Sequence, residues 1–232
     1  MISLNKIISK IINILFHLIN ILNFRMIIFY ILLLIIFVLW ILKHGKQLRS
    51  TYMKNESLPL VDIKDMAIYT GLSLISKGLK ATPLKLQKIL FYEQAWFMVF
   101  FGRENTLFAD VPQAWVNGPV YPSIFHEYKD KVTNMCDSLN KSHFTKKNID
   151  VALEKLANKM NFDKGILELI DSIITLYGSK TQNDLIFLTH SELPWVEARE
   201  GLAPFQSSQN PISQDTMYYY YKARQERNKS KY

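Results

Sequence analysis

The chain of 232 residues is poor in cysteine and lacks the common catalytic and metal-binding motifs. Cys136 is the single cysteine, which excludes an intrachain disulfide and a cysteine-based metal cage. The sequence contains no glycine-rich phosphate loop, no histidine pair at metal-ligand spacing and no internal repeat. We therefore predict no cofactor and no bound metal, and a reducing cytosol suits the globular part.

Acidic residues are also missing from the first part of the chain. Residues 1–52 contain six basic side chains and no acidic one, although the formal net charge of the whole chain is only +8. Residues 53–232 carry 22 basic and 20 acidic side chains, so this part is nearly neutral. Affinity for nucleic acid comes largely from neutralising phosphates. The charge therefore disfavours a DNA-binding transcriptional regulator, which remains an alternative function, and we expect no nucleic-acid partner.

One long apolar run stands near the N-terminus. Met26 to Leu42 is an uninterrupted series of seventeen uncharged, mostly aliphatic residues between Arg25 and Lys43. A helix that crosses a bilayer needs about 17–25 such residues. We therefore expect a transmembrane helix at residues 26–43, and the basic residues that follow it argue against a cleaved signal peptide.

The segments around this run complete the expected membrane attachment. Residues 1–25 form an amphipathic leader that suits the membrane interface, and residues 44–61 form a polar linker. The flanking positive charges favour a single-pass protein of the inner membrane with a cytoplasmic C-terminal domain. A start at Met53 remains the alternative, and it would give a cytoplasmic protein without the anchor.

Residues 82–128 contain the densest set of cap, turn and aromatic signals. Thr82 is a good helix cap, Pro83 fits the first helical position, and Gly102 is a typical helix end. Leu86 and Leu90 recur at helical spacing with many large apolar neighbours, which predicts a central and largely buried helix. The residues that supply a polar side of this helix are Lys85, Gln87, Lys88 and Gln94.

The remaining signals predict a mainly α-helical domain with a short β element over residues 62–222. Residues 110–116 favour an edge strand, Asn117, Gly118 and Pro119 favour a turn, and a helix should begin near Ser123. The other predicted segments are helices at 62–78, 151–160, 163–177, from Thr181, at 194–200 and from Ser213, a loop at 133–148, and a basic, solvated tail at 223–232.

Several short motifs follow one another in a recognisable order. They are Thr82-Pro83-Leu84-Lys85-Leu86-Gln87-Lys88 with Tyr92 and Trp96, Ala114-Trp115, Gly118-Pro119-Val120, Leu188-Thr189-His190 and Pro194-Trp195. Together they resemble the Panacea domain, the SocA-like antitoxin domain of bacteria and phages, over roughly residues 60–222. The resemblance implies an antitoxin that neutralises a cognate toxin by direct contact, or, as in some relatives, an adaptor that delivers the toxin to a cytosolic protease.

Two groups of motif residues serve as candidate sites. Aromatic side chains on turns can anchor a partner, and Trp115 and Tyr121 flank the rigid Gly118–Pro119 turn. The residues that we expect at the partner interface are Trp115, Gly118, Pro119, Tyr121, His190 and Trp195. The motif residues that we expect to be structural are Thr82, Pro83, Leu86, Gln87, Lys88, Tyr92 and Trp96.

His190 is also the one residue that suggests catalysis. A histidine close to Glu192 and Glu197 can act as a general base, which leaves a His190-dependent hydrolase as a further alternative. No nucleophile motif or acid pair accompanies it, so we predict a structural or partner-contacting histidine and no enzyme. Glu93, within the central helix, needs a hydrogen-bond partner if it is buried, and we expect that partner near His190.

Overall fold

The computed structural model describes residues 61–129 and 146–230. Internal contacts divide the chain into two units, Met1–Ser57 and Leu58–Tyr232, and all described residues belong to the second. The elements of the described part are α2 (Ile63–Ser76), α3 (Pro83–Phe101), β1 (Gln113–Trp115), β2 (Gly118–Val120), α4 (Pro122–Tyr128), α6 (Lys146–Lys159), α7 (Lys164–Gly178), α8 (Gln182–His190), α9 (Leu193–Ala198) and α10 (Gln214–Lys229). The mainly helical class with a short β element is confirmed.

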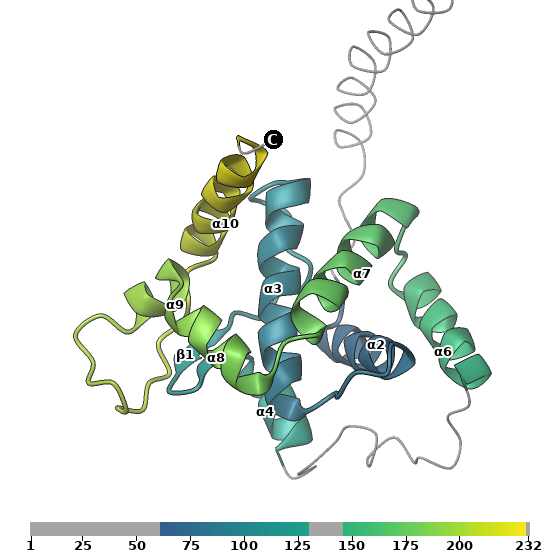
Figure 1. Cartoon of the computed structure of the whole chain (residues 1–232), viewed down its shortest axis with the longest axis horizontal. Coiled ribbons are helices and arrows are strands. Elements are labelled where there is room, and N and C mark those ends of the chain that lie inside the picture. The colour runs from purple at the N-terminus through teal and green to yellow at the C-terminus, as the bar shows by residue number, and fades with distance from the viewer. Residues whose placement is uncertain (1–60, 130–145, 231–232) are drawn as a thin grey trace, which may run out of the picture. The chain divides into compact units, whose positions relative to one another are not determined.

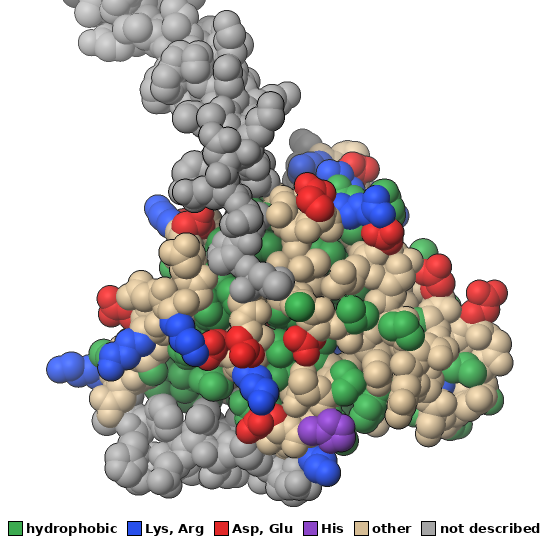
Figure 2. Space-filling view, turned by 180° about the vertical axis from the view of Figure 1, so that it is seen from behind, with side chains coloured by type: hydrophobic (Ala, Val, Ile, Leu, Met, Phe, Trp, Pro, Cys, Tyr) green, Lys and Arg blue, Asp and Glu red, His purple; other side chains and the backbone are tan. Residues whose placement is uncertain are grey.

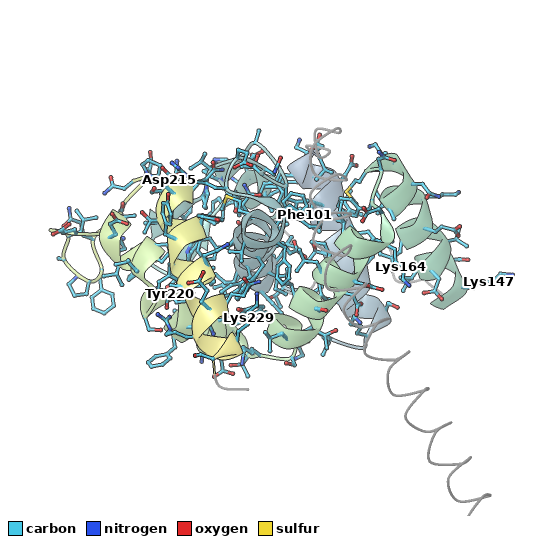
Figure 3. The ribbon with its side chains drawn as sticks, turned by 90° about the horizontal axis from the view of Figure 1, so that it is seen from above. Phe101, Lys147, Lys164, Asp215, Tyr220 and Lys229 are labelled. Atoms are coloured by element: carbon cyan, nitrogen blue, oxygen red, sulfur yellow. The ribbon has the colours of Figure 1, made fainter. Side chains whose placement is uncertain are left out.

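Helix α3 is the centre of this unit. It packs against α10 on one side and against α7 and α2 on the other, while α6 covers the outer side of α2 (Figure 1). Figure 3 looks along α3, with Phe101 at its near end and α10 beside it. Of its nineteen residues, fourteen are buried. Such a helix cannot have a wide solvent face, and its polar residues must find partners inside the protein.

The helix ends follow local signals in the sequence. The Thr82 hydroxyl accepts a hydrogen bond from the Lys85 amide at 3.3 Å, Pro83 occupies the first turn of α3, and Gly102 follows the last turn with a φ of 114°. At α8, Thr181 and Asp184 form a complete capping box. The predicted caps at both helices are confirmed.

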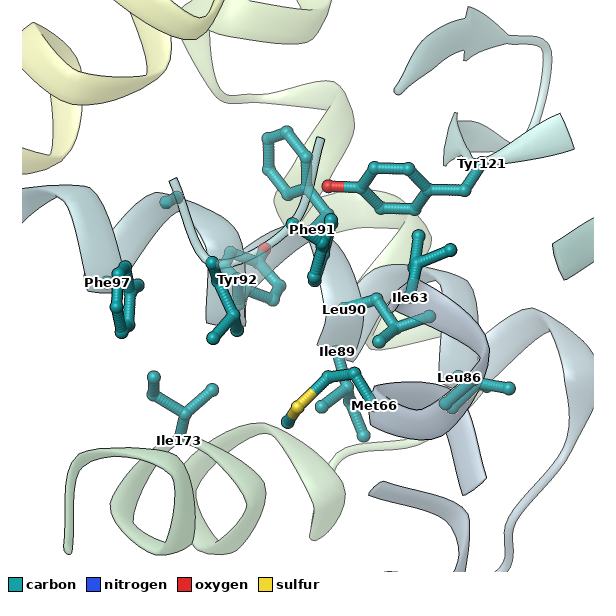
Figure 4. Close-up of a cluster of buried hydrophobic side chains, with 14 of the residues drawn as sticks. Ile63, Met66, Leu86, Ile89, Leu90, Phe91, Tyr92, Phe97, Tyr121 and Ile173 are labelled. Atoms are coloured by element: carbon teal, nitrogen blue, oxygen red, sulfur yellow. The ribbon is translucent and has the colours of Figure 1, made fainter. Parts of the chain in front are cut away.

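The hydrophobic core surrounds α3. Its fully buried members include Met66 of α2, Leu86, Leu90 and Phe97 of α3, and Ile170 of α7. Figure 4 shows part of this cluster, in which side chains from α2, α3 and α7 meet. Burying a large aliphatic or aromatic side chain stabilises a fold by roughly 1.5–3 kcal/mol. The core therefore fixes α3 as the scaffold for everything attached to it.

Several predicted boundaries are wrong by a few residues. The turn predicted at Asn117, Gly118 and Pro119 lies at 116–117, and Gly118 and Pro119 belong to β2, which pairs antiparallel with β1 so that Trp115 lies opposite Gly118. Helix α6 begins at 146, where a loop was expected, and α10 continues through Lys229 into the predicted tail. Ile149 is buried near the start of α6 and Arg224 binds Glu192 in the later part of α10, so both extensions carry a tertiary contact.

The expected membrane segments cannot be compared with this structure. The leader 1–25, the span 26–43 and the linker 44–60 lie outside the described residues. Within the described ranges, no helix combines the length and the apolar character that a membrane span requires.

Candidate functional site: a clamped hairpin beside a pocket

Polar side chains of α3 hold the β1–β2 hairpin on one side. The Gln87 side chain accepts a hydrogen bond from the Tyr121 amide at 2.7 Å and donates one to the Tyr121 carbonyl at 3.3 Å. The Lys88 ammonium donates to the Pro119 carbonyl at 2.9 Å. Gln94 bonds in the same two-way manner to the loop that precedes β1. Side chains of α3 thus provide hydrogen-bond partners for backbone groups on this side of the hairpin, as a third strand would do in a larger sheet.

The polar side of α3 faces the interior of the protein. Lys85, Gln87, Lys88 and Gln94 are all buried, and Lys85 donates to the Gly178 carbonyl at 2.8 Å. A buried polar group is costly without a partner, and each of these finds a backbone partner far away in the sequence. The spacing of these four residues along the helix does not predict their hydrogen-bond partners.

The other side of the hairpin is tied to α9 and to the segment before α10. The Trp195 indole N–H donates to the Trp115 carbonyl at 3.0 Å, and the Arg199 guanidinium donates to the Ala114 carbonyl at 3.0 Å. The Ala114 amide donates to the Asn210 carbonyl at 2.8 Å. Both edges of the two-stranded sheet are thus bonded to the rest of the protein.

Gly118 allows α3 and α8 to approach the hairpin closely. Its φ is +93°, a conformation that residues with a side chain rarely adopt. A Cβ atom at this position would stand 2.7 Å from the Thr189 hydroxyl oxygen and 2.8 Å from Lys88 Cε. The motifs around Lys88, Gly118 and Thr189 are therefore three parts of one packed junction.

A pocket of about 720 Å³ adjoins this junction. It lies between the first turns of α3, the hairpin and α4, and residues 207–209 and Gln182 complete its wall. The motif residues that line it are Thr82, Pro83, Leu84, Gln87, Lys88 and Trp115. Pockets of 300–1,000 Å³ with apolar walls and a few polar groups are typical ligand or anchor sites.

The electrostatics of the pocket are one-sided. Lys88 and the exposed Lys129 line it, and no Asp or Glu is found among its described lining residues. Lys88 is 1% exposed, and burial lowers the pKa of its ammonium group to about 7. Its only hydrogen bond within the described part of the chain is to one carbonyl, although an ammonium group has three donors. The pocket can therefore accept a negative charge more readily than a positive one.

His190 lies on the other side of this junction and does not line the pocket. Its ring stacks on Trp195 with 3.9 Å between centroids and 12° between planes. Burial, and then the charge of Lys88, lower the pKa of His190. Its Nε2 is buried and has no hydrogen-bond partner within residues 61–129 and 146–230. The stacking and the lowered pKa are those of a neutral, packed imidazole.

Tyr121 does not fit the predicted role of an exposed anchor. It is fully buried, directed into the core cluster (Figure 4), and packed edge-on against Phe108 with 5.2 Å between ring centroids. The expected exposure of Tyr121 is therefore wrong, because Gln87 draws its backbone onto α3 and turns the ring inward. Trp115, by contrast, is partly exposed and lines the pocket.

The expected partner of Glu93 is also wrong. The Thr70 hydroxyl of α2 donates to the Glu93 carboxyl group at 3.0 Å, so this residue links two helices of the core and lies away from His190. Burial raises the pKa of Glu93 to about 8, although the hydrogen bond from Thr70 opposes this shift.

The clamped hairpin lies within a region that matches a known protein family. Residues 86–196 match the family model described as Antitoxin SocA-like, Panacea domain. Over this region the chain is similar to the Panacea domain. The resemblance seen in the sequence is confirmed over a shorter span than expected, and the function it indicates is antitoxin-like. No curated protein and no solved structure matches the chain.

The folded unit has a second polar centre that the sequence analysis did not identify as a site. Glu192 is buried and accepts hydrogen bonds from Tyr92 at 3.1 Å, Tyr221 at 2.6 Å and Arg224 at 2.7 Å. Burial raises the pKa of Glu192, while the bonds from Tyr221 and the charge of Arg224 oppose this. Arg224, expected in a solvated tail, thus ties α10 to the domain. In the sequence, only the tyrosine cluster that precedes Arg224 could have suggested that this segment packs against the domain.

Proposed function

We propose that this protein neutralises a toxin by direct contact through the tip of the hairpin, at residues 115–117, and the adjoining pocket. The observation that carries the proposal is the convergence of the Panacea motifs, which lie far apart in the sequence, on one hairpin beside one pocket. A rigid scaffold with little spare hydrogen-bonding capacity is suited to presenting a fixed surface to a partner.

The tip of the hairpin supplies the contact residues of this surface. Trp115 and Val116 are partly exposed and Asn117 is exposed, while α3 and Trp195 hold the strands behind them. Tryptophan is a frequent hot spot at protein interfaces because it buries a large area and keeps one polar group. Trp115 therefore takes the anchoring role that the sequence assigned jointly to it and to Tyr121.

The two alternative functions gain no support. Acidic and basic side chains are interspersed over the face shown in Figure 2, whereas a protein that binds DNA gathers basic residues on one surface. His190 is packed against Trp195 and does not line the pocket, which does not favour the hydrolase. Antitoxin domains of this family are generally non-enzymatic.

A growth assay tests the proposal. The full chain is expressed together with the product of the neighbouring reading frame, and we expect it to relieve the growth arrest that this product causes. Trp115→Ala should weaken binding by about thirtyfold or more, the loss typical of an aromatic anchor. Phe187→Ala is the control, since this 75% exposed aromatic lies on α8 away from the pocket lining. Full protection by Trp115→Ala, at wild-type protein levels, contradicts the proposed surface.

The toxin can then meet either of two fates. Contact alone can block it, or the Panacea domain can present it to a cytosolic protease. Toxin half-life distinguishes the two in the same cells: neutralisation with an unchanged half-life supports contact alone, and a shortened half-life that depends on the protease supports delivery.

The segment at 26–43 adds a proposed location to this function. Its length and basic flanks favour attachment to the inner membrane with the Panacea domain in the cytoplasm. We expect the full chain to stay with membranes during carbonate extraction and a chain that starts at Met53 to be released. Release of both chains, or a native start at Met53, contradicts the anchor.

A further inference from the structure

We infer that the pocket beside the hairpin takes an acidic side chain of the partner protein, flanked by bulky apolar residues, and that the Lys88 ammonium is its charge partner. This inference rests on the proposed function for the identity of the partner, but not for the chemistry of the pocket. Three observations identify the occupant: the charges of the pocket, its apolar walls, and the hydrogen-bonded edges of the hairpin beside it.

The charge of the pocket selects an acid. Lys88 and Lys129 line it, and no carboxylate from the described residues does. Lys88 makes no ion pair within the described part of the chain, and two of its three N–H donors are unused there. A desolvated ammonium group with free donors gains most from a carboxylate, because both electrostatics and hydrogen bonding improve.

Two helix N-termini add to the same preference. Pro83 and Leu84 belong to the first turn of α3, and Gln182 to the first turn of α8, and all three line the pocket. The free amides of a first turn carry partial positive charge, which stabilises anions nearby, but Pro83 has no amide hydrogen and the Asp184 carboxylate already caps the first turn of α8. This contribution supports the lysines and would be too weak without them.

The walls of the pocket select apolar neighbours for that acid. Leu84, Trp115, Val116 and Phe125 line it and are partly exposed, so they offer apolar surface around the charged end. The Trp115 and Phe125 rings pack together at 4.7 Å between centroids, which makes a firm wall. A mixed site of this kind fits an acidic residue next to leucine or phenylalanine better than it fits an acid alone.

The hairpin leaves little room for the alternative of strand addition. The outer edge of β1 is bonded to residues 210–212. The Pro119 carbonyl of β2 is bonded to Lys88, and the Tyr121 amide that follows β2 is bonded to Gln87. A partner strand needs a free edge to extend a sheet. The partner must therefore engage the pocket through side chains.

A first experiment tests the pocket without the toxin. A capped tripeptide with glutamate between leucine and phenylalanine is titrated into the full chain in detergent micelles, beside its glutamine counterpart, with tryptophan fluorescence as the signal. We expect the glutamate peptide to bind about tenfold more tightly than the glutamine peptide. Equal binding of the two peptides overturns the inference, and this comparison needs no variant of the protein.

Matched lysine variants then assign the preference to one residue. Lys88→Met should remove the glutamate preference, while Lys85→Met should keep it, since Lys85 is a buried lysine of the same helix that does not line the pocket. Thermal unfolding of both variants verifies that they are folded. A preference that survives in folded Lys88→Met, or that inorganic phosphate removes at concentrations below the peptide Kd, overturns the assignment to an acidic peptide.

The toxin provides the second arm. Each acidic residue of the neighbouring gene product is changed to its amide, and binding is measured with wild-type and Lys88→Met chains. We expect one acid whose change weakens wild-type binding about tenfold but has no further effect on Lys88→Met. If the toxin binds and every change adds to that of Lys88→Met, the inference fails while the proposed function stands. If the toxin does not bind but the peptide preference holds, only the proposed function fails.

Discussion

At the scale of single residues, the junction of α3, the hairpin and α8 requires a residue without a side chain at one position. Gly118 has no side chain, and this lets the Lys88 stem and the Thr189 hydroxyl reach the same point. The carbonyl next to it then binds the Lys88 ammonium. One glycine therefore sets both the backbone path and the position of the pocket cation.

Gly118→Ala should destabilise the domain by about 2–4 kcal/mol, because it combines backbone strain with a clash. Gly201→Ala is the matched control: its φ is +78°, but no atom lies within 4 Å of the added Cβ. We expect that control to lose only about 1–2 kcal/mol. Urea unfolding of both variants measures the difference, and equal losses would show that the close approach at Gly118 is relaxed without cost.

Glu192 illustrates a different kind of residue. Two tyrosine hydroxyls and one guanidinium bind its carboxylate, and these partners come from α3 and α10. Removing one partner of such a buried pair lowers stability strongly, because the remaining charge is left unpaired. Replacing the whole pair by apolar residues costs far less. The site thus joins the two helices at one defined point.

At the scale of elements, α3 does two tasks with two kinds of side chain. Its apolar residues form the core with α2, α7 and α10, and its buried amides and lysines bind the backbone of the segment from 107 to 121. Because the same helix is the core and the clamp, disturbing its packing must also disturb the hairpin.

Leu90→Ala should remove about 2–5 kcal/mol of stability, since Leu90 is fully buried on α3. Phe100→Ala, on the same helix but 39% exposed, should cost far less although it deletes more atoms. Thermal melts of the two variants test this. A melting temperature for Leu90→Ala that equals the wild-type value would mean that the core lies elsewhere.

At the scale of the whole molecule, two buried ionisable groups of α3 make stability depend on pH in opposite directions. Folding raises the pKa of Glu93 from 4.5 to about 8 and lowers that of Lys88 from 10.5 to about 7. Between pH 4.5 and 8 the folded state keeps the Glu93 proton that the unfolded chain releases, so stability falls as pH rises. Between pH 7 and 10.5 the unfolded chain keeps the Lys88 proton that the folded state releases, so stability rises.

We therefore expect the free energy of unfolding of the full chain to pass through a shallow minimum near pH 7–8, as far as these two groups decide it. Glu93→Gln should remove the decline on the acidic side, and Lys88→Met the rise on the alkaline side. Urea titrations at a series of pH values measure both slopes. Slopes that are unchanged in both variants would show that other groups control the profile.

The sequence by itself determined most helices and their ends, and it revealed the family. Thr82, Pro83 and Gly102 act on atoms within one helical turn, and short-range signals of this kind can be read without knowing the fold. The motifs likewise identified the Panacea domain, because their residue types and order are visible in the chain alone.

Only the tertiary structure decided which side of each element faces inward and what the polar residues do. Gln87 and Lys88 look like surface residues until the backbone at 119–121, more than thirty residues away, comes within reach of them. Tyr121 looks like an exposed turn residue until that same contact rotates it into the core. Such partners are distant in the chain, and a buried polar group is stable only where the fold supplies one, so no local pattern can foretell the pairing.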